Sequence, residues 1–189
     1  MLPLIILTGP TGSGKSETAL ALARKLNTDI ISADSMQVYK YFDIGTAKPS
    51  LAAREEIPHH LIDILEPNQE FNAFSFKARA LNVILKLIKR GKVPILVGGT
   101  GLYIKALIED YDCAEGTSHK TRKKIGKDIC EQGVEKIYQE LQRVDPEYAT
   151  KISKTDSLRI ERALAVYLDT GKRFSEFHQN DSPASSRFP

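Results

Sequence analysis

GPTGSGKS, the stretch Gly9-Pro10-Thr11-Gly12-Ser13-Gly14-Lys15-Ser16, fills every fixed position of the phosphate-binding pattern G-x-x-x-x-G-K-[ST]. The apolar run at residues 3–7 before it is typical of a buried strand. Amphipathic-helix spacing follows it, at Ala19, Leu22, Ala23 and Leu26. A glycine loop between a strand and a helix lets backbone N–H groups surround a phosphate, and the helix N-terminus adds partial positive charge. We expect Lys15 to reach the terminal phosphates and Ser16 to ligate a magnesium ion, so the stretch predicts polyphosphate binding.

The composition is that of a globular chain with room for one substantial core, or for one core and a small appendage. Its 189 residues are 41% hydrophobic and 27% charged, as in soluble proteins. The net charge of +3 excludes a basic field over the whole surface, so nucleic-acid binding would need a local patch. The two cysteines, Cys113 and Cys130, match no metal-ligand spacing. Because neither a secretory leader nor a membrane-length apolar run is present, we expect a cytoplasmic protein without a membrane partner.

Strand-like and helical segments alternate up to about residue 109. Short runs at residues 29–33, 58–63 and 93–97 are typical of strands. A helical stripe ends at Lys89-Arg90-Gly91 and consists of Phe74, Ala78, Leu81, Leu85 and Ile88. This alternation predicts an α/β fold in which a P-loop-containing parallel sheet is flanked by helices. Beyond Asp112 helical patterns dominate, so we divide the chain into an α/β core at residues 1–112 and a helical part at residues 113–189.

The segment Asp34-Ser35-Met36-Gln37-Val38-Tyr39 follows the second predicted strand. Ligands gather at the carboxyl ends of parallel strands, so Asp34 is expected beside the phosphate loop if the first two strands are neighbours. Its carboxylate suits a general base or a magnesium partner, and a turn or helix-cap aspartate is the alternative. The block Gly98-Gly99-Thr100-Gly101-Leu102-Tyr103 follows another strand. We expect it to form a second wall of the site, where Thr100 offers a hydroxyl; a tight turn that needs glycine is the alternative.

Two further features near this region have both a functional and a structural interpretation. Lys48 could supply positive charge to the site, but a solvated surface lysine is the ordinary role of such a residue. His59 and His60 are adjacent, and adjacent side chains point apart in a strand. Because no cysteine or third histidine lies nearby, we favour structural roles for the pair over metal binding.

The helical part contains a basic run and a pair of arginines. Residues 117–128 include one acidic residue, Asp128, and five basic ones: Lys120, Arg122, Lys123, Lys124 and Lys127. A solvated helix face is the usual explanation, and contact with a phosphate backbone is the alternative. Further amphipathic helices are predicted at residues 134–141 and 157–168. The apolar side of the second one consists of Ile160, Leu164, Tyr167 and Leu168, while Arg159 and Arg162 share another face.

Together these blocks resemble the tRNA dimethylallyltransferases, also called tRNA isopentenyltransferases. The matching segments are residues 9–16, 32–40, 43–49, 58–64, 94–103 and 145–171. Many enzymes share the phosphate loop, whereas the block at residues 34–39 and its spacing to residues 98–103 are much more specific. The resemblance covers essentially the whole chain. Known members are longer, so it also implies that the C-terminal part of the core is missing here.

The resemblance implies transfer of a dimethylallyl group from its diphosphate to N6 of the adenine at position 37, next to a tRNA anticodon. The phosphate loop and Mg²⁺ at Ser16 would hold the diphosphate, with Asp34 as general base and Thr100 near the amine. The implied RNA contacts are Asp34, Ser35, Met36, Gln37, Thr100, Arg122, Leu158, Arg159, Ile160, Glu161 and Arg162. Leu158 departs from the glutamine of many members. The partners are then dimethylallyl diphosphate and the tRNA anticodon stem-loop, bound by a monomer whose residues 113–189 form an inserted RNA-binding domain and a connecting segment.

Three other functions are compatible with the same residues. A P-loop kinase would bind ATP at the loop and use Asp34 to activate a hydroxyl, although no arginine-rich lid follows the third predicted strand. An isopentenyltransferase for free adenylate would share the core but would not need the basic helical run. A nucleotide-regulated RNA-binding module would use the phosphate loop as a sensor without turnover.

Overall fold

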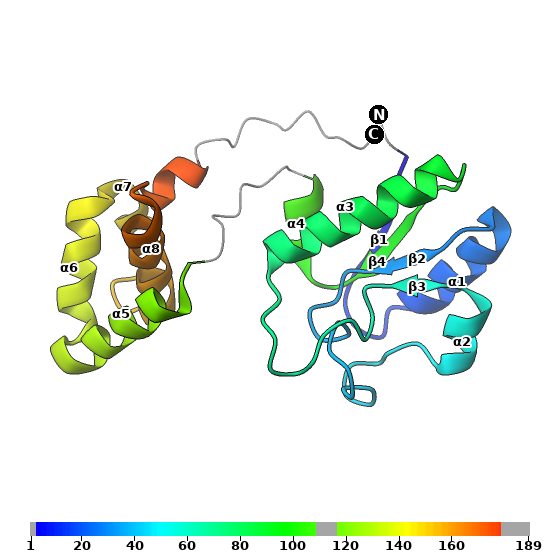
Figure 1. Cartoon of the computed structure of the whole chain (residues 1–189), viewed down its shortest axis with the longest axis horizontal. Coiled ribbons are helices and arrows are strands. Elements are labelled where there is room, and N and C mark those ends of the chain that lie inside the picture. The colour runs from blue at the N-terminus through cyan, green and yellow to red at the C-terminus, as the bar shows by residue number, and fades with distance from the viewer. Residues whose placement is uncertain (1–2, 109–116, 179–189) are drawn as a thin grey trace. The chain divides into compact units, whose positions relative to one another are not determined.

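The computed structural model describes residues 3–108 and 117–178, which belong to two compact units (Figure 1). The first unit contains the phosphate loop and the strands, and the second contains helices alone. Within the described ranges, no helix is long and apolar enough to cross a membrane.

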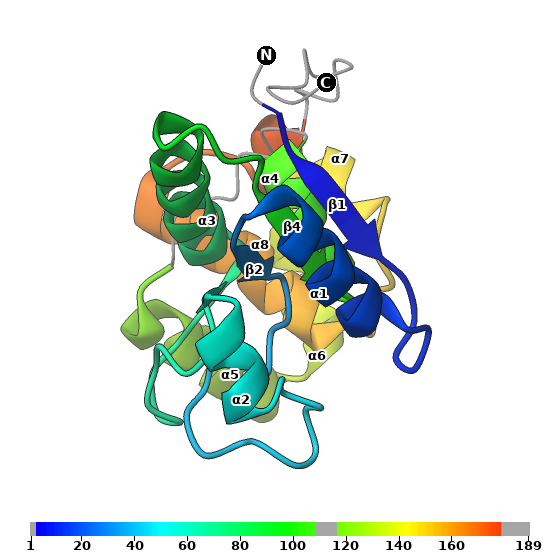
Figure 2. The ribbon, with the colours of Figure 1, turned by 90° about the vertical axis from the view of Figure 1, so that its right-hand side faces the viewer.

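The first unit is built on a four-stranded parallel sheet. Its strands are β1 (Ile5–Thr8), β2 (Ile30–Ser32), β3 (His59–His60) and β4 (Ile95–Gly98), in the spatial order β1-β4-β2-β3. Ile95 of β4 is paired with Ile5 on one side and with Ile30 on the other. The first two strands are therefore not neighbours, because β4 lies between them (Figure 2). The expected parallel α/β fold is confirmed, whereas the condition on which Asp34 was expected beside the phosphate loop, that the first two strands are neighbours, is not met.

Helices flank this sheet: α1 (Lys15–Leu26), α2 (Leu51–Glu56), α3 (Ala73–Lys89) and α4 (Gly101–Ile108). The small residues Ala19 and Ala23 let α1 pack closely on the sheet, where they join Ile30, Ile95 and Val97 in one cluster. Side chains alternate between the two faces of a strand. Leu96, next in the chain to Ile95, is also fully buried, so both faces of the sheet are covered.

The buried face of α3 differs from the predicted one. We expected the stripe that contains Phe74 and Leu85, but these side chains are 40% and 43% exposed. The structure instead buries Ala73, Phe76, Ala80, Ile84 and Leu87. Both sets have helical spacing, so the choice between them depends on tertiary packing. The prediction of the helix is confirmed, and the prediction of its core-facing side is wrong.

The second unit consists of α5 (His119–Gln132), α6 (Val134–Val144), α7 (Pro146–Ala149), α8 (Ser157–Thr170) and the 3₁₀ helix η1 (Phe174–His178). Its core includes Ile125, Ile137, Leu141, Ile160 and Leu164. Asp145 is buried at the start of α7, where its carboxylate accepts hydrogen bonds from Tyr148 N (3.1 Å) and Ser175 N (2.8 Å). Asp145 thus caps α7 and links η1 to it.

Candidate active site

The phosphate loop has the backbone geometry that its glycines predict. Gly12 and Gly14 have φ angles of 81° and 79°, in the left-handed region that favours glycine, and α1 begins directly after them at Lys15. Lys15 Nζ donates a hydrogen bond to the carbonyl of Pro10 at 2.5 Å and lies 3.4 Å from Ser13 Oγ. The ammonium group therefore lies over the loop at the N-terminus of a helix, an arrangement suited to an anion.

The ends of β2 and β4 approach each other too closely for any side chain on Gly98. A Cβ atom there would lie 2.2 Å from the carbonyl oxygen of Ala33. Ala33 N donates to Val97 O at 2.7 Å, and Thr100 N donates to Ala33 O at 3.2 Å. The glycine block at the end of β4 thus lies beside the residue that precedes Asp34, as a wall of the site would. Glycine is required at position 98 by the approach of β2, and not by the turn into the following helix that we gave as the alternative.

Asp34 has a structural contact on one carboxylate oxygen. Its Oδ1 accepts hydrogen bonds from Met36 N (2.8 Å) and Gln37 N (3.2 Å), which fixes the turn after β2. Thr100 Oγ1 supports the same turn by accepting from Ser35 N at 3.0 Å. Within residues 3–108 and 117–178, Asp34 Oδ2 accepts no hydrogen bond, and Asp34 lines a cavity next to the phosphate loop. One oxygen therefore holds the turn while the other is available for chemistry.

The cavity that these elements enclose has a volume of about 480 Å³. Phosphate-loop residues 11–16 line it together with Asp34, Gln37 and the glycines at positions 98 and 99. The structure thus brings the phosphate loop and Asp34 to one cavity, although β4 separates their strands. Ser35, Met36 and Thr100 adjoin it through the turn and are not among its lining residues.

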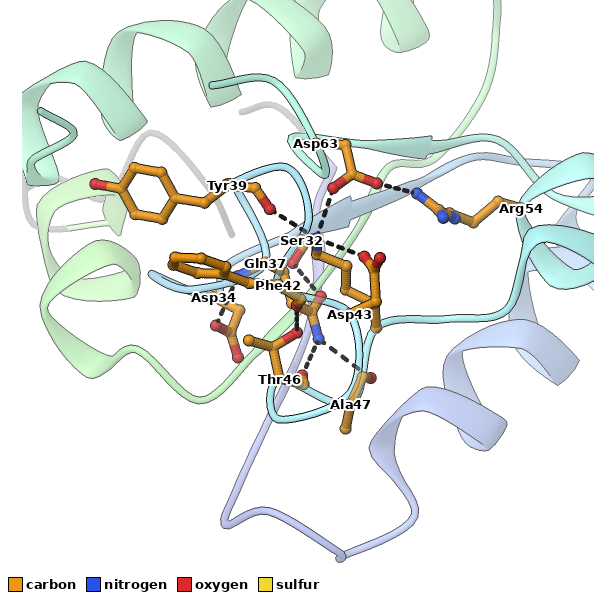
Figure 3. A network of polar contacts seen from close by, with 11 residues as sticks. Ser32, Asp34, Gln37, Tyr39, Phe42, Asp43, Thr46, Ala47, Arg54 and Asp63 are labelled. Atoms are coloured by element: carbon orange, nitrogen blue, oxygen red, sulfur yellow. Dashed lines mark hydrogen bonds and ion pairs between the residues drawn. The ribbon is translucent and has the colours of Figure 1, made fainter. Parts of the chain in front are cut away.

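Gln37 connects this turn to the loop at residues 42–49, which forms another wall of the cavity. Ser32 Oγ donates to Gln37 Oε1 at 2.9 Å, and Gln37 Nε2 donates to the carbonyls of Thr46 (3.0 Å) and Ala47 (3.4 Å) (Figure 3). We did not predict a wall at Thr46 and Ala47 from residue types. The matching family segment at residues 43–49 contains both Thr46 and Ala47, and it was the one feature of the sequence that could have indicated this wall.

Lys48 is not the surface lysine that we favoured. Its side chain is only 2% exposed, and Nζ donates to Tyr39 O (2.6 Å), Asp43 Oδ1 (2.9 Å) and Asp63 Oδ1 (2.6 Å). Burial lowers the pKa of the ammonium group, but the hydrogen bonds to the two carboxylates outweigh it and leave the pKa above its ordinary value. Lys48 is therefore charged, and its ammonium group binds Tyr39, Asp43 and Asp63.

Burial shifts the pKa values of two further groups in this unit, Tyr103 and His59. Burial is the main cause that raises the pKa of Tyr103 to about 12, with Tyr39 and Asp34 adding to it, so this phenol stays neutral. His59 lines the cavity, and burial lowers its pKa. Its Nδ1 lies 2.6 Å from Ile57 O, and His60 Nε2 lies 2.9 Å from Asp29 Oδ2. These contacts agree with the structural roles that we favoured for both histidines.

The remaining predicted RNA contacts, Arg122 and residues 158–162, belong to the second unit. Arg122 Nε donates to Glu161 Oε1 at 3.0 Å, Arg159 pairs with Asp156, and Arg162 lies over the ring of Phe174. Leu158 is 72% exposed. The five residues of the basic run are all exposed on α5: Lys120, Arg122, Lys123, Lys124 and Lys127.

Ile160 differs from these residues. It is completely buried in the core of the second unit, as its place on the apolar side of the helix predicts. A side-chain contact between Ile160 and RNA is therefore excluded in this structure, and the residue instead anchors the helix that presents its neighbours.

The cavity offers few oxygen ligands for a metal ion. Within the described residues there is no group of three or more His, Cys, Asp or Glu side chains that could hold a metal by itself. The cavity does offer the Ser16 hydroxyl and the Asp34 carboxylate. Mg²⁺ commonly binds through few protein oxygens and completes its shell with water and substrate phosphates, so this sparse set of oxygens suits it.

We next compared the chain with known proteins. The family model described as IPP transferase matches residues 37–189. This chain belongs to the IPP transferase family. The tRNA dimethylallyltransferase of Pelotomaculum thermopropionicum is 47% identical over 182 residues, which cover 96% of this chain and 58% of that protein. The enzyme of the same name from Aquifex aeolicus is 46% identical, over 96% of this chain and 59% of the relative.

Solved structures agree with this family. A eukaryotic dimethylallyltransferase acting on tRNA has a TM-score of 0.81 and 37% identity, over 96% of this chain and 45% of that one. The tRNA isopentenylpyrophosphate transferase of Bacillus halodurans has a TM-score of 0.58 and 37% identity, over 91% and 57% of the two chains. The family expected from the sequence is confirmed, and the chain spans less than two thirds of the length of these relatives.

Proposed function

We propose that this chain forms the catalytic part of an enzyme that transfers a dimethylallyl group from dimethylallyl diphosphate to N6 of adenine 37 in tRNA. The observation that carries the proposal is that one cavity contains both a phosphate loop and a carboxylate with an available oxygen. The family to which the chain belongs, and the names of its relatives, support the same reaction.

The phosphate loop would bind the diphosphate of the donor. Its N–H groups, the N-terminus of α1 and the Lys15 ammonium group would stabilise the negative charge that grows on the leaving diphosphate as the allylic C–O bond breaks. Ser16 would hold Mg²⁺, which adds Lewis-acid stabilisation to the same phosphates when it is bound.

Asp34 would act on the acceptor. The exocyclic amine of adenine is a poor nucleophile, and it must lose one proton when its nitrogen bonds to the allylic carbon. Asp34 Oδ2 would accept that proton while Oδ1 keeps its hydrogen bonds to the turn. Gln37 and Thr100 would hold the walls on either side of the base, with Ser35 and Met36 in the connecting turn.

RNA binding would come from the second unit. The target base must leave its stack to enter such a cavity, so the rest of the anticodon stem-loop has to be held by contacts outside it. Arg122, Arg159 and Arg162 and the exposed basic face of α5 would bind phosphates, while Leu158 and Glu161 would lie at the edge of the contact. We also propose that the protein binds the tRNA as a monomer.

A competition assay tests the proposal. A version of the chain extended to the length of its relatives would receive Mg²⁺, labelled dimethylallyl diphosphate, and an unmodified anticodon stem-loop with adenine at position 37. ATP would compete for the phosphate loop and AMP for the acceptor site. Label in the stem-loop alone is the expected result. Label in AMP would instead identify a free-adenylate enzyme, and tight ATP binding without any transfer would identify a kinase or a nucleotide sensor.

A further inference from the structure

The network around Lys48 is a group of charges with a buried ammonium group at its centre, and the proposed reaction does not use it. Lys48 Nζ has three acceptors, the carbonyl of Tyr39 and the carboxylates of Asp43 and Asp63, and the side chain is 2% exposed. Arg54 Nη1 donates to the second oxygen of Asp63 at 2.5 Å (Figure 3). Removing charges from water is costly even when they are paired, so a buried ion network is weak evidence for stability alone. The role of this network is better inferred from the backbone segments that it holds in place.

The network holds the Asp34 turn from two sides. Tyr39, whose carbonyl accepts from Lys48, ends the segment that Asp34 begins. Asp63, whose carboxylate lies 2.6 Å from Lys48 Nζ, donates its backbone N–H to Gln37 O at 3.1 Å. The N–H of Gln37 in turn donates to Asp34 Oδ1. Two short paths of hydrogen bonds and backbone therefore join the Lys48 ammonium group to the carboxylate in the cavity.

The Gln37 side chain closes this arrangement into a ring. It donates to the carbonyls of Thr46 and Ala47, the two residues that precede Lys48. Figure 3 shows Gln37 between the Asp34 turn and this loop, with Asp63 and Arg54 on the other side of the network. The same loop residues line the cavity, so the ring forms the wall against which the acceptor base would lie.

Backbone strain in the same region gives a second, independent observation. Five non-glycine residues in the described part of the chain have left-handed φ angles, and four of them flank this network: Tyr41 (69°), Ala47 (48°), Leu61 (64°) and Asp63 (54°). Such conformations cost free energy and persist where the surrounding contacts determine them, which occurs often at functional sites. Lys48 supplies contacts that hold these segments.

We propose that Lys48 is a positioning residue, whose buried ammonium group fixes the turn at residues 34–39 and thereby holds Asp34 and Gln37 at the cavity. The inference rests on the proposed function for its effect on transfer, and on the structure alone for its effect on the turn. It deepens that function by assigning the placement of the base to a residue that does not touch the reacting atoms.

Hydrogen exchange tests the effect on the turn without any need for activity. The Met36 and Gln37 amides donate to Asp34 Oδ1, so Lys48→Met is expected to speed their exchange about 10-fold or more while the amides of α1 keep theirs. The matched control is Lys40→Met, which removes a half-exposed ion pair with Glu66 from the same segment and should leave both amides unchanged. Unchanged exchange in Lys48→Met would overturn the proposal, as would a uniform increase over the whole unit.

Two further variants keep the test decisive. If Lys48→Met does not fold, Asp43→Asn removes the charge of one exposed partner of Lys48 and should speed exchange of the same two amides by a smaller factor. Lys48→Arg keeps the charge and should restore part of the protection. Wild-type exchange in Asp43→Asn, in the absence of a folded Lys48→Met, would count against the proposal.

Single-turnover transfer, measured well below the unfolding temperature, tests the effect on chemistry. Lys48→Met should slow transfer about 10- to 100-fold at saturating substrates, because a small displacement of a catalytic group is enough for such a loss. The dissociation constant for dimethylallyl diphosphate should stay within about twofold, since the contacts of Lys48 in the described part of the chain are to Tyr39, Asp43 and Asp63 and not to the phosphate loop. A lower unfolding temperature with an unchanged rate would show a purely structural lysine. If the wild type transfers nothing, the proposed function fails, and the exchange result still decides whether Lys48 positions Asp34.

Discussion

Gly98→Ala is the substitution whose effect follows most directly from the structure. The added Cβ would lie 2.2 Å from Ala33 O and 2.4 Å from Ala33 C. A carbon and a carbonyl oxygen need about 3.3 Å. Because both obstacles are backbone atoms, no rotation of a side chain can relieve the clash, and the ends of β2 and β4 must move apart by about 1 Å.

The cost of that movement can be estimated from the bonds at the same point. Two hydrogen bonds, Ala33 N to Val97 O and Thr100 N to Ala33 O, would be weakened. Each contributes about 1 kcal/mol, and overpacking a close contact costs roughly 1–3 kcal/mol more. We expect a loss of about 3 kcal/mol, which lowers the unfolding temperature of a unit of this size by roughly 15 °C.

Thermal unfolding followed by circular dichroism measures this loss. Gly101→Ala is the matched control, because a Cβ there meets no atom within 4 Å and the residue begins α4. That variant should unfold at or slightly above the wild-type temperature. If Gly98→Ala unfolded within about 3 °C of the wild type, the close approach of the two strands would be refuted, together with the placement of Asp34 that depends on it.

Three other predictions concern charge. Lys15→Met should weaken binding of Mg²⁺–pyrophosphate about 10- to 100-fold in calorimetry, because a charge-assisted contact to the phosphates is lost; unchanged affinity would remove Lys15 from the site. Arg122→Ala should reduce the salt dependence of stem-loop binding by about one unit of slope, and an unaltered slope would exclude the phosphate contact. Burial raises the pKa of Asp63, but its hydrogen bonds to Lys48 and Arg54 outweigh it and leave the pKa below its ordinary value. Its stabilising effect is therefore present above about pH 4 and lost as the pH falls through the folded-state value, so Asp63→Asn should flatten the acid part of the stability profile.

The sequence predicted the elements of the site better than their arrangement. The phosphate loop, the strands and the helices at residues 15–26 and 73–89 have strong local patterns, and they were found where the patterns lie. The short helix α2 after the second strand was not predicted. The insertion of β4 between β1 and β2 has no local pattern, because periodicity describes one element at a time. The prediction that Asp34 lies near the loop was right for a reason that the sequence did not contain, the close approach at Gly98.

Burial was the least predictable property of single residues. Lys48 resembles a surface lysine in the sequence, and only the fold brings Asp43 and Asp63 to it. Leu168 was placed on the apolar side of its helix but is 59% exposed, because Ala163 and Val166 occupy the core with Ile160. Small residues are weak markers of a buried face in a sequence, yet they allow close helix packing.

Single-turnover prenyl transfer by Asp34→Asn tests the central claim most directly. Asparagine keeps the oxygen that accepts from Met36 N and Gln37 N, so the turn is preserved while the base is removed. We predict that transfer to the stem-loop slows at least ~100-fold, whereas the dissociation constants for the stem-loop and for pyrophosphate stay within about twofold. Transfer by Asp34→Asn at the wild-type rate would contradict the claim that this carboxylate accepts the proton from adenine.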